Sequence, residues 1–272
     1  WGVRRDHRQM RQNSVAWGGL QLAANDAPSY AVAMTWSIVA KDAASGAFGV
    51  AVASKVLAVG AICPWLEADT GALSTQSYTN PLYGPDVLAR LAAGDSIEAA
   101  IGAVTSADEG RAFRQVHGVD AQGNAFAYTG ASCVDWNGHV LGEGVSVAGN
   151  MLVGRAVVSE TMKAWIDGWE KPFARRLMDA LAAGETAGGD KRGKQSAAIK
   201  IVKAEQWPWI DLRIDDAAEP VRELSRMLDT FLAERAPYYV TLATRNNPAG
   251  VYDLAEREAY QAGYRKALGE ER

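Results

Sequence analysis

The sequence predicts an α+β fold in which antiparallel hairpins form sheets and helices cover them. An apolar, β-branched run over residues 35–40 precedes a turn at residues 42–46 and a second apolar run at residues 48–55, the pattern of a β-hairpin. Another pair of short strand-like runs flanks the turn at residues 120–124. The helical segments lie between groups of strands and do not follow each strand. This order favours layered antiparallel sheets over βαβ winding.

The composition is that of an ordinary globular protein. The 272 residues are 48% hydrophobic and 22% charged, with a formal net charge of -4, so a sizeable core is expected. No basic stripe is available to neutralise phosphates, which argues against a nucleic-acid partner. The sequence has no run of eighteen or more apolar residues, so we expect no transmembrane helix and no membrane partner.

The two cysteines, Cys63 and Cys133, cannot form a disulfide framework, and no Cys/His cluster suggests zinc. We expect both to be small buried hydrophobic residues. Neither a metal nor an organic cofactor is predicted. The nine tryptophans supply apolar surface that is compatible with a homodimer.

Residues 1–34 are set apart from the predicted fold. The segment has no sustained strand or helix period, and three interpretations compete. It has early basic residues and ends Ala31-Val32-Ala33, as a secretory signal can. Its middle is poor in apolar residues, being interrupted by Gln21, Asn25, Asp26 and Pro28. It can also be a propeptide, or upstream sequence with translation starting at Met34. We favour the last interpretation and expect a cytoplasmic protein, with export as the alternative.

The first domain is expected to span residues 35–235. After the hairpin, a third strand at residues 71–77 leads to a loop, a helix at residues 86–93, and a helix with a capping box of Asp95 and Glu98. Further strands are expected at residues 113–119, 125–129, 144–147, 196–202 and 209–214. Helices are expected at residues 155–183, kinked or divided at Pro172, and at residues 219–234. Residues 236–272 form a C-terminal extension with a final helix at residues 254–268.

The segment Gly188-Gly189-Asp190-Lys191-Arg192-Gly193-Lys194-Gln195-Ser196 contains the opening of a P-loop. Gln195 stands where a P-loop needs Ser or Thr for magnesium. A predicted helix precedes the loop and a strand follows it, whereas phosphate binding needs strand then helix. We therefore interpret the segment as a solvated turn or as a site loop that supplies Asp190 and Arg192.

Thr35 is the candidate nucleophile. A hydroxyl needs a base, and an N-terminal threonine has one in its own α-amine, with a pKa near ~8. Any residue attached before Thr35 turns that amine into a non-basic amide. Met34 precedes a small residue, which is the arrangement that a methionine aminopeptidase processes. A threonine at the start of a strand is also common for purely structural reasons.

A set of motifs in order along the chain resembles one family. They are Thr35-Trp36-Ser37-Ile38-Val39-Ala40, Gly49-Val50-Ala51-Val52-Ala53-Ser54-Lys55, Gln76, Asn80-Pro81-x-Tyr83-Gly84, Thr129-Gly130, Gly149-Asn150-Met151-Leu152, Gly188-Gly189-Asp190-x-Arg192-Gly193-x-Gln195-Ser196-Ala197 and Asp211-Leu212-Arg213-x-Asp215-Asp216. The chain from Thr35 to about Phe231 resembles a bacterial family of uncharacterised proteins with an N-terminal-nucleophile (Ntn) hydrolase-like fold. The resemblance implies a four-layer αββα sandwich of two antiparallel sheets, and amide cleavage through a covalent acyl intermediate.

Further site residues follow from position within these motifs. Lys55 ends the strand paired with that of Thr35, so it can keep the amine neutral or bind a carboxylate. Asn150 can donate to an oxyanion. The predicted substrate-binding residues are Ser54, Gln76, Asn80, Tyr83, Asp190, Arg192 and Arg213. Each of these residues also has a purely structural interpretation. Lys55 can be a solvated lysine at a strand end, and Asn150 a turn-forming asparagine. Gln76 and Asn80 can form loop hydrogen bonds, and Asp190, Arg192 and Arg213 can form an ion-pair network.

Two hypotheses for function follow. The first is an amidohydrolase that acts on a small amide or N-acyl compound, with Thr35 as nucleophile. The second is a non-catalytic ligand-binding or assembly module on the same fold.

Overall fold

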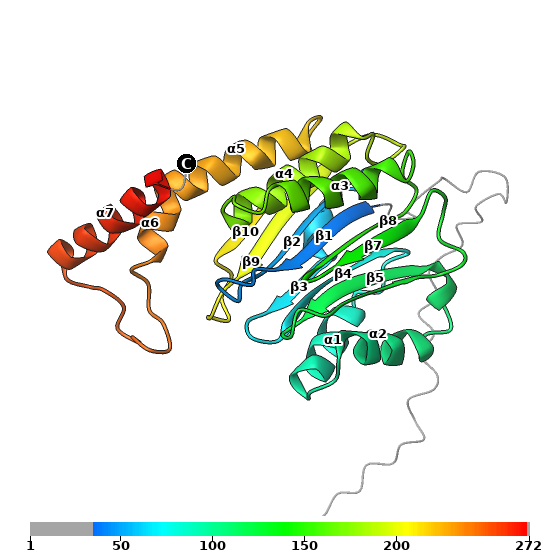
Figure 1. The fold of residues 1–272 in the computed structure, drawn as a ribbon, viewed down its shortest axis with the longest axis horizontal. Coiled ribbons are helices and arrows are strands. Elements are labelled where there is room, and N and C mark those ends of the chain that lie inside the picture. The colour runs from blue at the N-terminus through cyan, green and yellow to red at the C-terminus, as the bar shows by residue number, and fades with distance from the viewer. Residues whose placement is uncertain (1–34, 271–272) are drawn as a thin grey trace, which may run out of the picture. The chain divides into compact units, whose positions relative to one another are not determined.

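The computed structural model describes residues 35–270, and two antiparallel sheets form its framework (Figure 1). The six-stranded sheet has the order β10-β9-β2-β1-β8-β7 and the four-stranded sheet the order β3-β4-β5-β6. The strands are β1 Thr35–Lys41, β2 Phe48–Ser54, β3 Pro64–Glu67, β4 Gly71–Ser77, β5 Arg114–Asp120, β6 Ala125–Thr129, β7 Gly138–Gly142, β8 Val145–Gly149, β9 Ser196–Val202 and β10 Ile210–Ile214. A mixed fold of antiparallel sheets and several helices is therefore confirmed.

Helices pack against both sheets, and the two sheets also pack against each other. Helices α3 and α4 cover β1, β2 and β8, α5 lies against β9 and β10, and α1 and α2 lie against the four-stranded sheet. The α-helices are α1 Tyr83–Ala92, α2 Ile97–Ser106, α3 Ala156–Asp167, α4 Phe173–Thr186, α5 Pro220–Thr230, α6 Ala236–Tyr239 and α7 Leu254–Glu270. Short 3-10 helices lie at Val59–Ala61 and Arg111–Phe113, and a π-helix lies at Phe231–Arg235.

Strand β1 shows how the sequence divides the interior. Alternate side chains of a strand point to opposite faces of the sheet. Trp36, Ile38 and Ala40 therefore join the large apolar core beneath α3, α4 and α5. Thr35 and Ser37 belong to the opposite face, which contacts β4 and β5 of the other sheet.

The space between the sheets is divided into an apolar half and a polar half. The apolar half is filled by buried side chains of both sheets: Val39, Phe48, Val50, Ala72, Val119 and Val202. The polar half contains fully buried hydroxyl, amide and imidazole groups around the first residues of β1. Buried polar groups are costly unless they are hydrogen-bonded, so this half must be organised as a network.

Several details of the expected elements are corrected. The helix that we expected at residues 86–93 begins at Tyr83, and the expected strand at residues 144–147 is longer and paired with the unpredicted β7. The unpredicted β3 pairs with β4. The cap of α2 is Ser96, whose Oγ accepts from the Ala99 N–H at 3.2 Å, and not Asp95. The chain divides at Pro172, as expected, because proline lacks the N–H needed inside a helix.

Both cysteines are buried and free, as predicted. Among residues 35–270, no helix combines the length and apolar character needed to cross a membrane. The expectations for residues 1–34 lie outside the described residues.

Candidate active site

The backbone carbonyl of Thr35 is held by three donors. The Asn150 N–H donates to it at 3.0 Å, and the Asn150 Nδ2 and Gln76 Nε2 groups donate at 3.4 Å each. Thr35, Gln76 and Asn150 are all fully buried. The first residue of β1 is therefore fixed by the loop after β8 and by a side chain of the opposite sheet.

The hydroxyl of Thr35 lies beside that of Ser54. The two residues are paired directly in the β1–β2 ladder, and Thr35 Oγ1 donates to Ser54 Oγ at 3.3 Å. Directly opposed residues share a face of the sheet, which is why the two hydroxyls meet. The hairpin thus brings these two predicted site residues together at one end of the sheet.

Gln115 on β5 connects the residues around Thr35. Its Oε1 accepts from Gln76 Nε2 at 2.8 Å and from Asn150 Nδ2 at 3.0 Å. Its Nε2 donates to Thr129 Oγ1 and to the Gly149 carbonyl at 3.0 Å each. Both ends of this one amide are used, so Gln115 fixes the orientation of the neighbouring amides. Sequence reasoning did not identify Gln115.

A second branch of the network runs through Ser37 and His117. Ser37 Oγ lies 2.7 Å from Gln76 Oε1 and 2.7 Å from His117 Nε2, and His117 Nδ1 lies 2.9 Å from Ser146 Oγ. Gln76 Oε1 can only accept, so Ser37 donates to it and His117 Nε2–H donates to Ser37. Burial, with a smaller contribution from His139, lowers the pKa of His117 to about 3. His117 is therefore neutral at physiological pH.

Asp190 and Arg192 form an ion pair on the loop that precedes β9. Arg192 Nη2 lies 2.7 Å from Asp190 Oδ2, and its Nε donates to Oδ1 at 3.1 Å. The same carboxylate accepts the Lys55 N–H at 2.9 Å, which joins this loop to the end of β2. The Lys55 ammonium is exposed and donates to the Lys194 carbonyl at 3.1 Å. Asp190 thus acts as an anchor for the loop.

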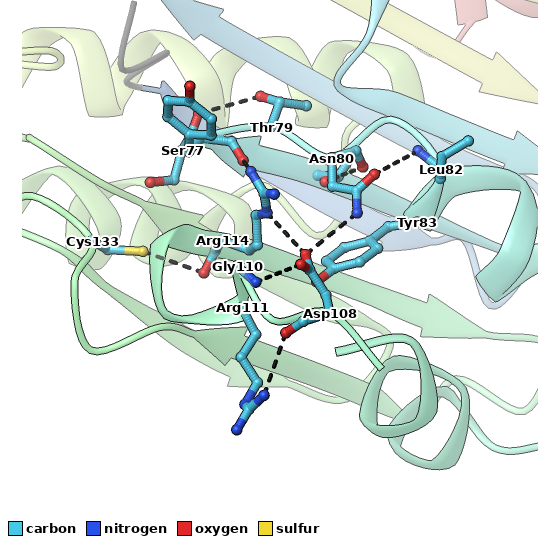
Figure 2. A network of polar contacts seen from close by, with 12 residues as sticks. Ser77, Thr79, Asn80, Leu82, Tyr83, Asp108, Gly110, Arg111, Arg114 and Cys133 are labelled. Carbon is cyan, nitrogen blue, oxygen red and sulfur yellow. Dashed lines mark hydrogen bonds and ion pairs between the residues drawn. The ribbon is translucent and has the colours of Figure 1, made fainter. Parts of the chain in front are cut away.

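Asn80 and Tyr83 belong to a separate cluster around Asp108 (Figure 2). Asp108 Oδ2 accepts from Tyr83 Oη at 2.7 Å, Arg114 Nε at 3.0 Å and Asn80 Nδ2 at 3.4 Å. Burial raises the pKa of Asp108, but hydrogen bonds from Tyr83, Arg114, Gly110 and Asn80 outweigh this and lower it to about 2. The carboxylate ties the loop before α1 to β5.

Arg213 lies apart from both groups. It forms a two-point ion pair with Asp215, with Nε–Oδ1 at 3.1 Å and Nη2–Oδ2 at 2.8 Å. The structure therefore brings Thr35, Ser54, Gln76 and Asn150 together and connects Asp190 and Arg192 to Lys55. It places Asn80 and Tyr83 around Asp108.

Sequence reasoning missed Ser37, Gln115 and His117 in the network around Thr35, and Asp108 in the separate cluster. One signal was present, since Ser74 and Gln76 on β4, and Gln115 and His117 on β5, are polar pairs two positions apart. Such spacing places both members on one face of a strand. Ser77 and Met151, which directly follow Gln76 and Asn150, have φ angles of 68° and 48°. Non-glycine residues with this backbone conformation are uncommon and concentrate at functional sites.

The family model for a family of unknown function, DUF1028, matches residues 35–224. The chain belongs to the DUF1028 family. The crystal structure of a DUF1028 protein from Silicibacter pomeroyi is similar to this chain at 30% sequence identity, with a TM-score of 0.75. The similarity covers 81% of this chain and 100% of the other. No curated protein matches the sequence.

The DUF1028 match begins at Thr35 and includes Ser54, Gln76, Gln115 and Asn150. It ends at Leu224, before the expected C-terminal extension. Within residues 35–270, no group of three or more His, Cys, Asp or Glu side chains is placed to hold a metal ion.

Proposed function

We propose that this DUF1028 protein is an Ntn-type amidohydrolase that cleaves a small amide or N-acyl compound, with Thr35 as the first residue of the working chain. The observation that carries the proposal is the placement of Thr35 at the start of β1, with its hydroxyl beside Ser54 and its carbonyl held by Asn150 and Gln76. A nucleophile must be held rigidly for attack, and this network provides that rigidity. The layers of helix, sheet, sheet and helix agree with the four-layer αββα Ntn arrangement.

The proposed reaction has two steps. Thr35 Oγ1 attacks the substrate carbonyl while the α-amine of Thr35 takes the hydroxyl proton and passes it to the leaving nitrogen. The C–N bond breaks, the amine departs, and an ester to Thr35 remains. Water, deprotonated by the same amine, then attacks the ester and releases the acid. The chemistry uses no cofactor.

The other predicted site residues receive roles by position. Lys55, Asp190 and Arg192 lie on connected segments at the end of β2 and form the proposed polar border of the substrate site, with the Lys55 ammonium available to a substrate carboxylate. Asn80, Tyr83 and Arg213 would act only indirectly, through loop position. We place the working protein in the cytoplasm.

One observation favours a second candidate, a ligand-binding module without catalysis. The donors of Asn150 that were predicted to stabilise an oxyanion already bind the Thr35 carbonyl and Gln115. An oxyanion role would require one of these bonds to break. A module that only binds ligand would have no such requirement.

A reactive acyl probe tests the proposal. The chain beginning at Thr35 is prepared by proteolytic removal of a leader and treated with a β-lactone, which adds its whole mass to an attacking hydroxyl. We expect a single adduct at Thr35 in peptide mass spectra, no adduct in Thr35→Ala, and slow labelling when Met34 remains attached.

Two outcomes would reject the enzyme. Equal labelling and hydrolysis with Met34 attached would show that no free amine is needed. A lack of labelling in the correctly processed chain, together with tight small-molecule binding, would support the module instead. Thr35→Ser serves as the matched control because it keeps a hydroxyl at the same atom position.

A further inference from the structure

The side-chain oxygen of Asn150 is a buried acceptor that receives no hydrogen bond within the described residues. The other end of the amide is fully used, because Nδ2 donates to the Thr35 carbonyl at 3.4 Å and to Gln115 Oε1 at 3.0 Å. Both of those partners are acceptors, so the amide cannot be turned around. Asn150 is 0% exposed, and a buried polar atom without a hydrogen bond is destabilising. The site therefore lacks a donor.

The strand register indicates where a donor would come from. Trp36 is paired with Gly149 in the antiparallel β1–β8 ladder, so Thr35 lies opposite Asn150. Opposed residues place their side chains on the same face, within about 4.5–5.5 Å between Cβ atoms. The Thr35 carbonyl already points to Asn150. In an extended strand the N–H and C=O of one residue point to the same side, so the Thr35 nitrogen also faces Asn150.

We propose that the free α-amine of Thr35 donates a hydrogen bond to Asn150 Oδ1, which makes Asn150 a positioning residue for the catalytic base. This inference rests on the proposed function in one respect, namely that Thr35 becomes the first residue. Loss of the preceding residue converts a single amide N–H into an amine or ammonium with two or three N–H groups. The additional donors arise beside the acceptor that lacks one.

This assignment changes the role expected for Asn150. As an oxyanion donor it would have to give up a bond to Thr35 or Gln115, whereas as an acceptor it keeps both. Asn150 Oδ1 orients the Thr35 amine by accepting its hydrogen bond, and the β1–β2 pairing orients the Thr35 hydroxyl toward Ser54. Both reacting groups of Thr35 are then fixed by neighbouring strands.

Charged groups near this end of the sheet are held in other contacts. Asp190 is paired with Arg192, and Lys55 donates to the Lys194 carbonyl. On β5 of the facing sheet, His117 stays neutral and is separated from the amides by Ser37, and Arg114 is paired with Asp108. On β7, His139 Nδ1 lies 3.2 Å from Thr129 Oγ1. These groups also influence the pKa of the Thr35 amine, but their influence is the same in the variants compared below.

The test measures the pKa of the Thr35 amine by NMR of the chain that begins at 15N-labelled Thr35. In Asn150→Asp, a carboxylate replaces the neutral acceptor and favours the ammonium, so the amine pKa should rise by about 1 or more. The ascending limb of the pH profile for β-lactone labelling should move to higher pH by the same amount. Asn247→Asp is the matched control, because Asn247 is exposed in the segment between α6 and α7 and belongs to neither sheet. It should leave the amine pKa unchanged.

A crystal structure of the unmodified chain beginning at Thr35 provides a measurement that needs neither variant folding nor substrate. We expect the Thr35 nitrogen within about 2.7–3.2 Å of Asn150 Oδ1. A water on Oδ1 with the amine bound elsewhere, or equal amine pKa values in the Asn150→Asp and unmodified chains, would overturn the inference. The short contact in a protein that never transfers an acyl group would reject the proposed function and keep the inference. Acyl transfer by a protein whose amine is bound elsewhere would keep the proposed function and reject the inference.

Discussion

Ser37 on β1 and His117 on β5 are joined across the two sheets, with Ser37 Oγ 2.7 Å from His117 Nε2. Both residues are fully buried, and the same hydroxyl also bonds Gln76, which donates to the Thr35 carbonyl. A protonation change or a lost hydroxyl at this position is therefore transmitted to the start of β1 through two hydrogen bonds. Satisfied networks of this kind favour one arrangement of the strands.

The depressed pKa of His117 predicts a pH-dependent stability. The unfolded chain binds a proton near pH 6.5, whereas the folded chain does so only near pH 3. Between these values the unfolded state holds more protons, so stability is complete above pH 6.5 and falls as the pH is lowered toward 3. His117→Gln should reduce this slope by up to about 1.4 kcal/mol per pH unit. Urea denaturation from pH 4 to pH 7 measures it.

The slope is the quantity compared, because His117→Gln also alters stability at pH 7. His139→Gln is the comparison variant. Desolvation also lowers the pKa of His139, but its side chain is largely exposed to solvent, so its loss should change the slope less. Equal slopes in the unmodified chain and His117→Gln would contradict a neutral buried imidazole.

Removal of the Ser37 hydroxyl should destabilise the protein. Ser37→Ala leaves Gln76 Oε1 and His117 Nε2 without their shortest partner, at a cost of about 1–3 kcal/mol in the free energy of unfolding. Ser45→Ala removes an exposed hydroxyl that bonds Asp42, and its effect should stay within about 0.5 kcal/mol. Urea denaturation at pH 7 compares the two, and equal effects would argue against a cooperative buried network.

Asp108 should be important for the loop that carries Asn80 and Tyr83. Asp108→Asn removes the charge that Arg114 and Tyr83 bind, and we expect a loss of about 1–3 kcal/mol at pH 7. Because the folded pKa is about 2, this contribution is present above pH 4 and disappears as the pH falls toward 2. The exposed neighbour supplies the control, Glu109→Gln. If both variants melt like the unmodified chain, Asp108 does not hold the loop.

Two glycine-to-alanine substitutions should change the stability of the protein in opposite directions. A Cβ at Gly84 would lie 2.0 Å from the Trp65 ring, so Gly84→Ala should cost about 1–3 kcal/mol or more through overpacking. A Cβ at Gly102 within α2 meets no atom within 4 Å. Gly102→Ala should therefore stabilise the helix by about 0.5–1 kcal/mol. Thermal denaturation of both variants checks the pair, and a stable Gly84→Ala would mean that Trp65 packs elsewhere.

Local patterns were sufficient for much of the fold. The hairpin of β1 and β2, the division at Pro172 and the burial of both cysteines follow from residue types and short-range turn chemistry. The same reasoning misplaced the cap of α2, because Asp95 and Ser96 are adjacent residues that both favour caps. It also missed β7, a half-exposed strand whose pattern is weak without its partner β8.

The candidate site was only partly accessible from sequence. The meeting of Thr35 and Ser54 follows from hairpin pairing, and the sequence also determined Thr35 as a strand's first residue. The contacts of Thr35 with Gln76 and Asn150 span 41 and 115 positions, so no local propensity encodes them. They exist because β8 lies beside β1 and because β4 and β5 pack on that strand from the other sheet. Only tertiary structure decides such neighbours, since strand pairing depends on which faces can be buried together across the whole chain.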